Sequence, residues 1–138
     1  MGPVTVFVDT SAIVAVILDE RGASGLIGQL EHADRRLTSP AVRLETCMVL
    51  ASRLDIPPLA AQDLFDDFLL QSEVVELPID ERVGRLAVEC FERYGKGRHP
   101  AQLNFGDCLS YACAKAHGAA LLFKGDDFAQ TDVKARGA

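Results

Sequence analysis

Acidic side chains occupy positions in this sequence where a globular domain rarely places charge. Each position ends an apolar segment, opens a helix or interrupts an apolar helical pattern; they are Asp9, Glu45, Asp107 and the pair Asp126-Asp127. Carboxylates crowded into one pocket raise one another's pKa and cannot all stay ionised without a cation. Because hard divalent cations prefer oxygen ligands, the pattern predicts an acidic site for Mg²⁺ or Mn²⁺.

Three of these positions also have an ordinary structural explanation. Asp9 can cap the helix that follows it, although ligands of open α/β sheets also bind at such strand ends. Asp107 stands three residues after Asn104, as in a capping box, but the first turn of a helix also favours a negative ligand. Asp126 and Asp127 match a Gly-Asp turn. Asp9 and the aspartate pair both follow candidate parallel strands, which favours one shared sheet edge.

Glu45 lies on an apolar face of a predicted helix. The residues three and four positions away from it are Ala41, Val42, Met48 and Val49. A carboxylate on such a face destabilises the fold unless it is paired or bound to a metal. The alternative to a metal is an ion pair with a nearby arginine, for which Arg43 and Arg53 are the candidates.

Polar and basic residues near these acids are candidates for contacts with a phosphate group. Thr10 and Ser11 can orient a carboxylate, touch a phosphate or cap a helix. Lys96, Arg98 and His99 lie in a glycine-containing loop just before Asp107, where they could bind a phosphate backbone. A solvated mobile loop is the alternative explanation of these basic residues.

Several other kinds of chemistry find no support in the sequence. There is no G-x-x-x-x-G-K-[ST] segment, which excludes an ATP-binding P-loop. No Ser-His-Asp or Cys-His arrangement is apparent. The four cysteines form no C-x-x-C pair and have no histidine at zinc-like spacing, so we predict reduced, buried thiols. They are Cys47, Cys90, Cys108 and Cys113.

The elements that must position the acids alternate between strand and helix. Strands are predicted at 4–8, 37–39, 74–77 and 119–123, the last strand of the chain. Helices are predicted at about 12–18, 24–32, 40–54, 57–71, 81–94 and 104–117. This alternation predicts an α/β fold with a parallel sheet between layers of helices.

Composition is that of one globular domain spanning residues 1–138, with 49% hydrophobic and 25% charged residues. The sequence has no apolar run of the ~20 residues that span a bilayer and no secretory signal, so we expect a cytosolic location without membrane contact. The net charge is −6, from 14 basic and 20 acidic residues. It argues against a general nucleic-acid binder, although a bound cation would offset part of it.

Taken in order, these motifs resemble those of PIN-domain nucleases, and most closely those of the VapC-type toxins of bacterial toxin–antitoxin pairs. The resemblance covers almost the whole chain, and its two downstream segments are the most specific. The segments that carry it are Val8–Ala12, the helical Glu45, Tyr94–Pro100, Leu103–Cys108 and Leu122–Phe128 with Thr131-Asp132.

The resemblance implies a three-layer sandwich with a short, mostly parallel sheet flanked by helices. It implies a Mg²⁺- or Mn²⁺-dependent endoribonuclease that cleaves tRNA or another structured RNA. It also implies a homodimer that a VapB-type antitoxin neutralises. Applied residue by residue, it gives Asp9, Glu45 and Asp107 as catalytic acids and metal ligands.

The fourth acid of the family is the point at which this sequence departs from the pattern. Many PIN domains carry that acid at the position of Gly125, and related toxins often have Asn where this chain has Asp126. We therefore predict Asp127 as the fourth acid, with Asp126 as a weaker, direct or water-mediated helper.

Two other classes of protein would also use an acidic pocket at a sheet edge. A non-enzymatic, receiver-like Mg²⁺-binding signalling module has an acidic pair after its first strand, whereas here Asp9 stands alone before Thr10 and Ser11. A phosphatase of the haloacid dehalogenase type needs a second Asp two residues after the first, where this chain has Ser11. Phosphorylation by acetyl phosphate would identify a receiver.

Overall fold

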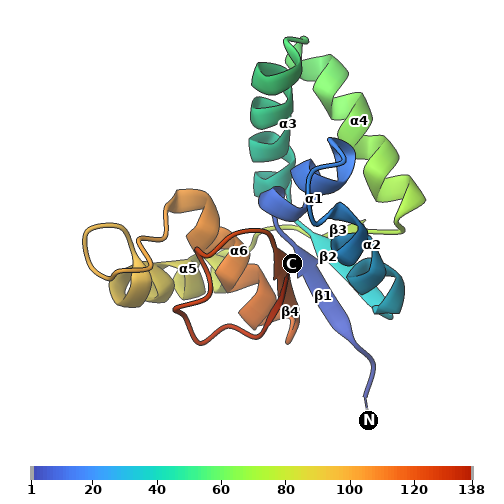
Figure 1. The fold of residues 1–138 in the computed structure, drawn as a ribbon. Coiled ribbons are helices and arrows are strands. Elements are labelled where there is room, and N and C mark those ends of the chain that lie inside the picture. The colour runs from blue at the N-terminus through green and yellow to red at the C-terminus, as the bar shows by residue number, and fades with distance from the viewer. Residues whose placement is uncertain (1, 138) are drawn as a thin grey trace.

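The described part of the chain forms a five-stranded, fully parallel sheet at its centre (Figure 1). The computed structural model describes the backbone of residues 2–137 and the side chains of residues 2–134. In spatial order the strands are β3 (Val75–Glu76), β2 (Arg35–Thr38), β1 (Thr5–Val8), β4 (Ala120–Phe123) and β5 (Ala135–Gly137). The predicted α/β class and parallel sheet are confirmed.

Strand β1 is the central strand, which explains its apolar sequence. It pairs with β2 on one side and β4 on the other, so Phe7 lies between Leu37 and Leu121. All three side chains are almost fully buried. A strand covered on both faces has no polar face to solvate, and its sequence is therefore continuously apolar rather than alternating.

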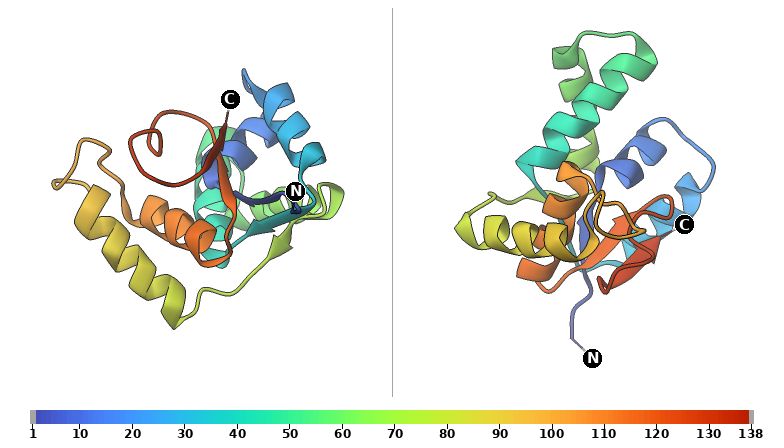
Figure 2. Two further views of the ribbon diagram at one scale, coloured as in Figure 1. Left: turned by 90° about the horizontal axis from the view of Figure 1, so that it is seen from below. Right: turned by 90° about the vertical axis from the view of Figure 1, so that its left-hand side faces the viewer.

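Six helices surround the sheet within the described residues. They are α1 (Thr10–Ile17), α2 (Ala23–His32), α3 (Pro40–Leu54), α4 (Pro58–Gln71), α5 (Glu81–Tyr94) and α6 (Phe105–Ala116). Helices α1 and α2 lie on one side of the sheet and α5 and α6 on the other (Figure 2). Helices α3 and α4 form a hairpin beyond the carboxyl ends of the strands, with α3 in contact with both α1 and α6 (Figure 1).

Local capping signals determine where α3, α5 and α6 begin. Ser39 caps α3 with its side chain, and Pro40 occupies the first turn, where its missing N–H costs nothing. Asp80 caps α5 in the same way, and Asn104 and Asp107 form a complete capping box at α6. These predicted boundaries are confirmed to within one or two residues.

The prediction that 119–123 is the last strand is wrong, because β5 follows it and pairs with β4. Its three residues, Ala135–Gly137, have little intrinsic strand preference. Their conformation comes from pairing with the free edge of β4, which no local pattern announces. Strand β3 is also shorter than predicted, at two residues.

The described residues share one continuous hydrophobic core between the sheet and its helices. As predicted, all four cysteines are free and buried in it. Among the described residues, no helix combines the length and apolarity needed to cross a bilayer.

Candidate functional site

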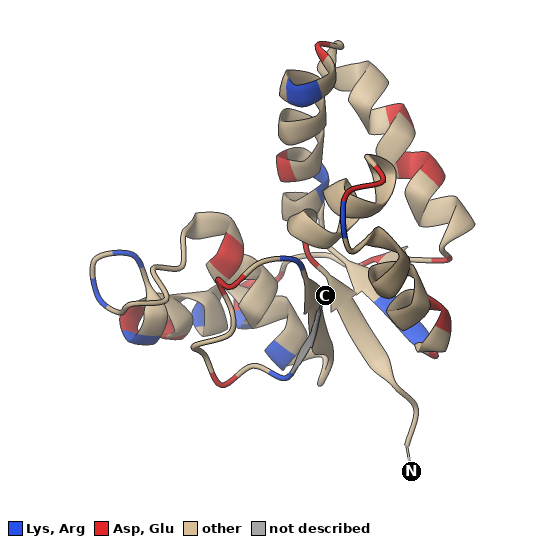
Figure 3. Cartoon of the chain, in the orientation of Figure 1, with Lys and Arg blue, Asp and Glu red and all other residues tan. Residues whose placement is uncertain are grey.

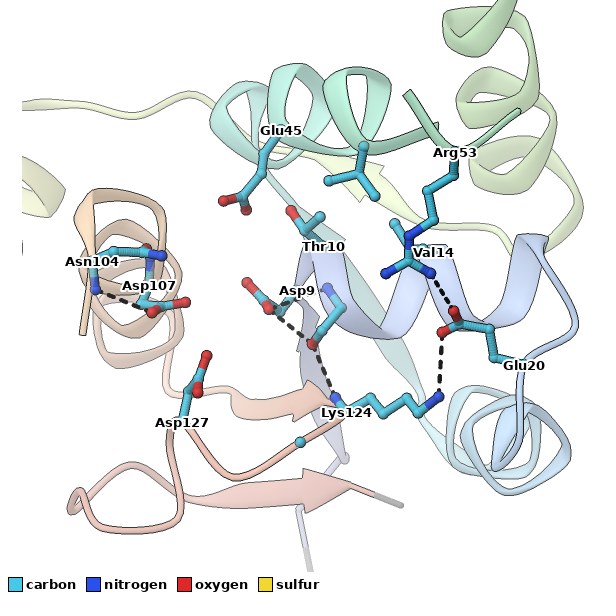
Figure 4. Close-up of a pocket in the computed structure, with 13 residues that line it drawn as sticks. Asp9, Thr10, Val14, Glu20, Glu45, Arg53, Asn104, Asp107, Lys124 and Asp127 are labelled. Atoms are coloured by element: carbon cyan, nitrogen blue, oxygen red, sulfur yellow. Dashed lines mark hydrogen bonds and ion pairs between the residues drawn. The ribbon is translucent and has the colours of Figure 1, made fainter. Parts of the chain in front are cut away.

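A cavity of about 460 Å³ opens at the carboxyl ends of β1 and β4, between α1, α3 and α6 (Figure 4). Besides Glu20, which pairs with basic residues, four acidic residues that are far apart in the sequence line it: Asp9, Glu45, Asp107 and Asp127. They come from the end of β1, the second turn of α3, the first turn of α6 and the loop after β4. Parallel strands end at one edge of the sheet, which is why these segments meet there.

Asp9 is the most enclosed of the four acids, with 4% of its surface exposed. Its Oδ1 accepts a hydrogen bond of 2.6 Å from the Ser110 hydroxyl, and its Oδ2 accepts one of 3.0 Å from the Ser11 hydroxyl. Oδ2 also accepts the backbone N–H of Ser11, so Asp9 caps α1 as well. Burial raises the pKa of Asp9, and the charge of Glu45 adds to this, while the serine hydrogen bonds oppose it.

Asp107 closes the capping box of α6 and also faces the cavity. Its Oδ2 accepts the backbone N–H of Asn104 at 3.1 Å, and its own N–H donates to Asn104 Oδ1 at 2.9 Å. The pKa of Asp107 is raised to about 7, chiefly by burial; the capping hydrogen bond from Asn104 lowers it, and the charges of Asp9, Asp127 and Glu45 add to the rise. A carboxylate in this position gains from any cation that enters the cavity.

Glu45 lies at the junction of α3 and α6, directly over Gly106. A methyl group added at Gly106 would stand 2.7 Å from Glu45 Oε2, so the glycine makes room for this carboxylate. Neither arginine proposed as its partner binds it, because Arg43 pairs with Glu76 and Asp66, and Arg53 pairs with Glu20. Within the described residues, Glu45 has no hydrogen bond or ion pair.

The helical face around Glu45 is less buried than its apolar sequence suggested. Met48 is 63% exposed, whereas Val42 is buried. Glu45 itself is half-buried. Glu45 is therefore a candidate site residue because its side chain points into the cavity, and not because it is buried in the core (Figure 4).

Of the two adjacent aspartates, Asp127 lines the cavity and Asp126 does not. The charge of Asp127 reaches Asp107, whose pKa it raises. Both aspartates are exposed, and Gly125 before them adopts a φ of 102°, which L side chains rarely take. The turn directs Asp127 toward the other three acids (Figure 4).

Thr10 and Ser11 both line the cavity. The Ser11 hydroxyl acts as both donor and acceptor, because it donates to Asp9 and accepts the backbone N–H of Lys124 at 2.9 Å. The Thr10 hydroxyl is buried and has no hydrogen-bond partner among the described residues. A buried hydroxyl without a partner is costly, so Thr10 is suited to bind a ligand or a water.

The predicted basic loop does not reach this cavity. Lys96, Arg98 and His99 are absent from its lining. The loop between α5 and α6 projects from the opposite side of the molecule to α2 (Figures 1 and 3). Arg98 donates to the backbone of Glu92, and His99 packs edge-on against Tyr94, so both have local structural partners.

Sequence reasoning missed the basic side of the cavity. Arg53 and Lys124 line it together with Glu20, which pairs with both. These three residues lie in separate segments, so no spacing connects them. Ser110 could have been found, because it lies one helical turn after Asp107 and so points in the same direction.

The donor set of the cavity fits a hard divalent cation, since it consists of carboxylate and hydroxyl oxygens. Among the described residues, however, no three His, Cys, Asp or Glu side chains are already gathered closely enough to hold a metal ion. The four carboxylates face the same cavity but lie too far apart to coordinate one ion together. A cation would have to draw them together.

Comparison with known proteins identifies a family. The model of the PIN domain matches residues 6–134. The chain is 44% identical over 128 residues to a protein of Mycolicibacterium smegmatis called Ribonuclease VapC, an alignment that covers 93% of this chain and 97% of that protein.

Two solved structures share the fold. VapC20 of Mycobacterium tuberculosis, described as a toxin that cleaves the sarcin–ricin loop, superposes with a TM-score of 0.73 at 19% identity, covering 93% of this chain and 95% of that one. A toxin–antitoxin complex from Klebsiella pneumoniae gives a TM-score of 0.66 at 19% identity, with 92% of each chain covered.

Proposed function

Because this chain belongs to the VapC ribonucleases of the PIN-domain family, we propose that it is a metal-dependent endoribonuclease toxin that hydrolyses RNA phosphodiesters. The whole chain would act as one nuclease domain. Asp9, Glu45, Asp107 and Asp127 would be its catalytic acids, with Asp126 in a weaker supporting role. Family membership rules out the receiver-like module as the alternative.

One observation carries the metal part of the proposal. Four carboxylates from separate segments line one cavity, and those of Asp9 and Asp107 have raised pKa values that burial and mutual repulsion explain. No described basic side chain pairs with any of the four. Such an arrangement is unfavourable for an empty protein at neutral pH, and a divalent cation relieves it.

Mg²⁺ or Mn²⁺ would be held by Asp9, Asp107, Asp127 and Glu45. Bound there, the cation would neutralise phosphate charge and lower the pKa of a coordinated water. Ser110 and Ser11 keep both oxygens of Asp9 in a fixed orientation, and the Asn104 N–H holds Oδ2 of Asp107. This pre-organisation matters because misplaced ligands lose catalytic effect steeply.

In the proposed reaction, a water oxygen attacks phosphorus, and the bond from phosphorus to the 3′-oxygen breaks. That oxygen gains a proton, which leaves a 5′-phosphate and a 3′-hydroxyl. The described histidines offer no pair for acid–base chemistry, since His99 packs against Tyr94 outside the cavity. Thr10 and Ser11, at the cavity wall, would contact the substrate.

We further propose that a VapB-type antitoxin neutralises the toxin and that the active form is a homodimer in the cytoplasm. An acidic cavity is complementary to an arginine side chain, which binds carboxylates bidentately and would compete with the cation. The known toxin–antitoxin complex of the same fold supports the existence of such a partner.

The test is to digest end-labelled RNA with Mg²⁺ or Mn²⁺ and to identify the new ends by ligation and mass spectrometry. We expect 5′-phosphate and 3′-hydroxyl ends, and no cleavage in excess EDTA. Asp9→Asn, purified in parallel, controls for contaminating ribonucleases and should be inactive. A 2′,3′-cyclic phosphate, or full activity in EDTA, would refute the mechanism and the metal assignment together.

A further inference from the structure

The cavity has a basic wall as well as an acidic one. Arg53, from the last turn of α3, and Lys124, directly after β4, face it from the side opposite Asp107 (Figure 4). Glu20, in the turn before α2, lies between the two cations. Its Oε2 binds Arg53 Nη1 at 2.6 Å, and its Oε1 binds Lys124 Nζ at 3.2 Å.

Glu20 neutralises only part of the positive charge of Arg53 and Lys124 and occupies only some of their hydrogen-bond donors. Two positive charges share one carboxylate, so the cluster keeps a net positive charge beside the acids. A guanidinium has five N–H donors and an ammonium has three. Within the described residues, Arg53 uses one donor and Lys124 uses one through its ammonium group. The other donors are free to bind an anion.

The position of Lys124 is coupled to that of Asp9. The backbone N–H of Lys124 donates to the Ser11 hydroxyl at 2.9 Å, and that hydroxyl donates to Asp9 Oδ2 at 3.0 Å. A single serine thus fixes the start of the lysine side chain relative to the most buried acid. An anion held by Lys124 would therefore lie at a defined place beside the reacting phosphate.

We propose that Arg53 and Lys124 form a subsite for an RNA backbone phosphate next to the cleaved one, and that Glu20 holds both cations in the free protein. This inference rests on the proposed function, because it takes the acids to be the place of cleavage. RNA phosphate would bind the free donors of both cations and would displace the Glu20 carboxylate from the donors that it occupies. An acidic protein with net charge −6 needs such local positive charge to bind RNA.

The competing explanation is that the three residues are an ordinary surface ion-pair cluster that ties α3 and β4 to the turn before α2. Exposed pairs of this kind contribute little to stability, and their loss would not alter RNA affinity. The two explanations therefore differ in what they predict for RNA affinity and for its dependence on salt concentration.

The experiment measures binding of a fluorescent single-stranded RNA in EDTA over a range of KCl concentrations, and cleavage with Mn²⁺. Arg53→Gln and Lys124→Met, which keeps most of the aliphatic stem, should each weaken binding about 10-fold. Each should lower the slope of log affinity against log salt by about 0.7. KM should rise while kcat stays within a few-fold of wild type.

Arg85→Gln is the matched control, because Arg85 is an exposed arginine paired with a glutamate, Glu81, away from the cavity. It should leave affinity and salt slope unchanged. Lys124→Arg should restore both, and it also tests the subsite if Lys124→Met proves unstable. Glu20→Gln should tighten binding by freeing the cations.

Wild-type affinity and slope in Arg53→Gln and Lys124→Met would overturn the subsite, as would losses equal to that of Arg85→Gln. Weaker binding by Glu20→Gln would overturn the displacement of Glu20. If wild type cleaves RNA and Asp9→Asn does not, these failures concern the subsite alone. Absence of cleavage by wild type would instead remove the proposed function.

Discussion

Asp107 closes the capping box of α6 and also faces the acidic cavity, so the two roles that its position suggested are compatible. The capping bond needs only an acceptor oxygen, whereas a metal site needs the negative charge. Asparagine supplies the first and lacks the second. Substitution by asparagine can therefore separate the two roles.

We expect Asp107→Asn to lower the cleavage rate at least ~100-fold, because the position of the cation depends on this charge. The circular dichroism spectrum should stay that of wild type, since the Asn side chain can still accept the Asn104 N–H. Near-normal activity would mean that Asp107 is a cap and not a ligand.

The same variant should show an opposite effect on stability. Because the pKa of Asp107 is raised to about 7 in the folded state from 3.8, the folded protein binds more protons than the unfolded chain between these values. Stability from this group is therefore lost as pH rises from about 4 toward 7. In EDTA, Asp107→Asn should match wild type near pH 4 and melt several degrees higher at pH 8. Asp63→Asn, on the exposed face of α4, should show no such pH-dependent gain.

Gly106 offers a second test at the scale of one residue. An added Cβ would stand 2.7 Å from Glu45 Oε2, and the flexible glutamate, not the backbone, must move. We expect Gly106→Ala to keep its melting temperature and to lose about 10-fold in cleavage rate, because a displaced catalytic carboxylate loses effect steeply. Gly84→Ala in α5, where nothing lies within 4 Å of the new methyl group, is the matched control. Equal activity in both variants would show that the position of Glu45 is unimportant.

At the scale of elements, a helix or strand could be predicted where nearby residues encode it, and could not where it depends on contacts with distant parts of the chain. The starts of α3, α5 and α6 depend on caps encoded within four residues, and they could be predicted from the sequence. Strand β5 depends on pairing with the edge of β4 and could not. The same holds for the cavity: Asp9 and Asp127 follow strands and were found, whereas Arg53 and Glu20 meet only through the packing of α3 against the turn before α2.

The loop that carries Asp127 is anchored at its far end by Asp132. The Tyr111 hydroxyl donates to Asp132 Oδ1, and Lys115 Nζ lies 3.0 Å from Oδ2. Both partners come from α6, the helix that also carries Asp107. These contacts therefore hold the loop of Asp127 against the helix that carries Asp107.

Tyr111→Phe should loosen that anchor without opening the core, because it removes only the hydroxyl. We expect a loss of about 1.5–3 kcal/mol in unfolding free energy, as for hydrogen bonds to charged groups. Amide exchange should speed up in residues 124–134 more than in α1. Uniform faster exchange throughout the chain would indicate a global effect and not a loop anchor.

At the scale of the whole molecule, the parallel sheet is what makes an acidic cavity out of distant segments. The strands all point the same way, so the residues after β1 and β4 meet at one edge, and α3 and α6 begin there too. Other acidic residues, such as Asp63, Asp66 and Asp67 on α4, are exposed, and none of these three lines the cavity; Figure 3 shows how the acidic positions are spread over the elements. The unfavourable charge is thus concentrated at the site, and stability of the entire fold should respond to its neutralisation.

Divalent cations should therefore stabilise the whole molecule. A ligand that binds only the folded state adds about 2.7 kcal/mol at one hundred times its Kd. We expect Mn²⁺ or Mg²⁺ to raise the melting temperature of wild type by several degrees relative to EDTA, and to raise that of Asp9→Asn much less. Because Asp9 is buried and hydrogen bonded by Ser110, its asparagine variant keeps the shape of the site while losing charge. Asp63→Asn, which lies outside the cavity, should respond like wild type. Equal metal-induced shifts in Asp9→Asn and wild type would exclude Asp9 as a ligand, and no shift in either would mean that these carboxylates do not form a cation site.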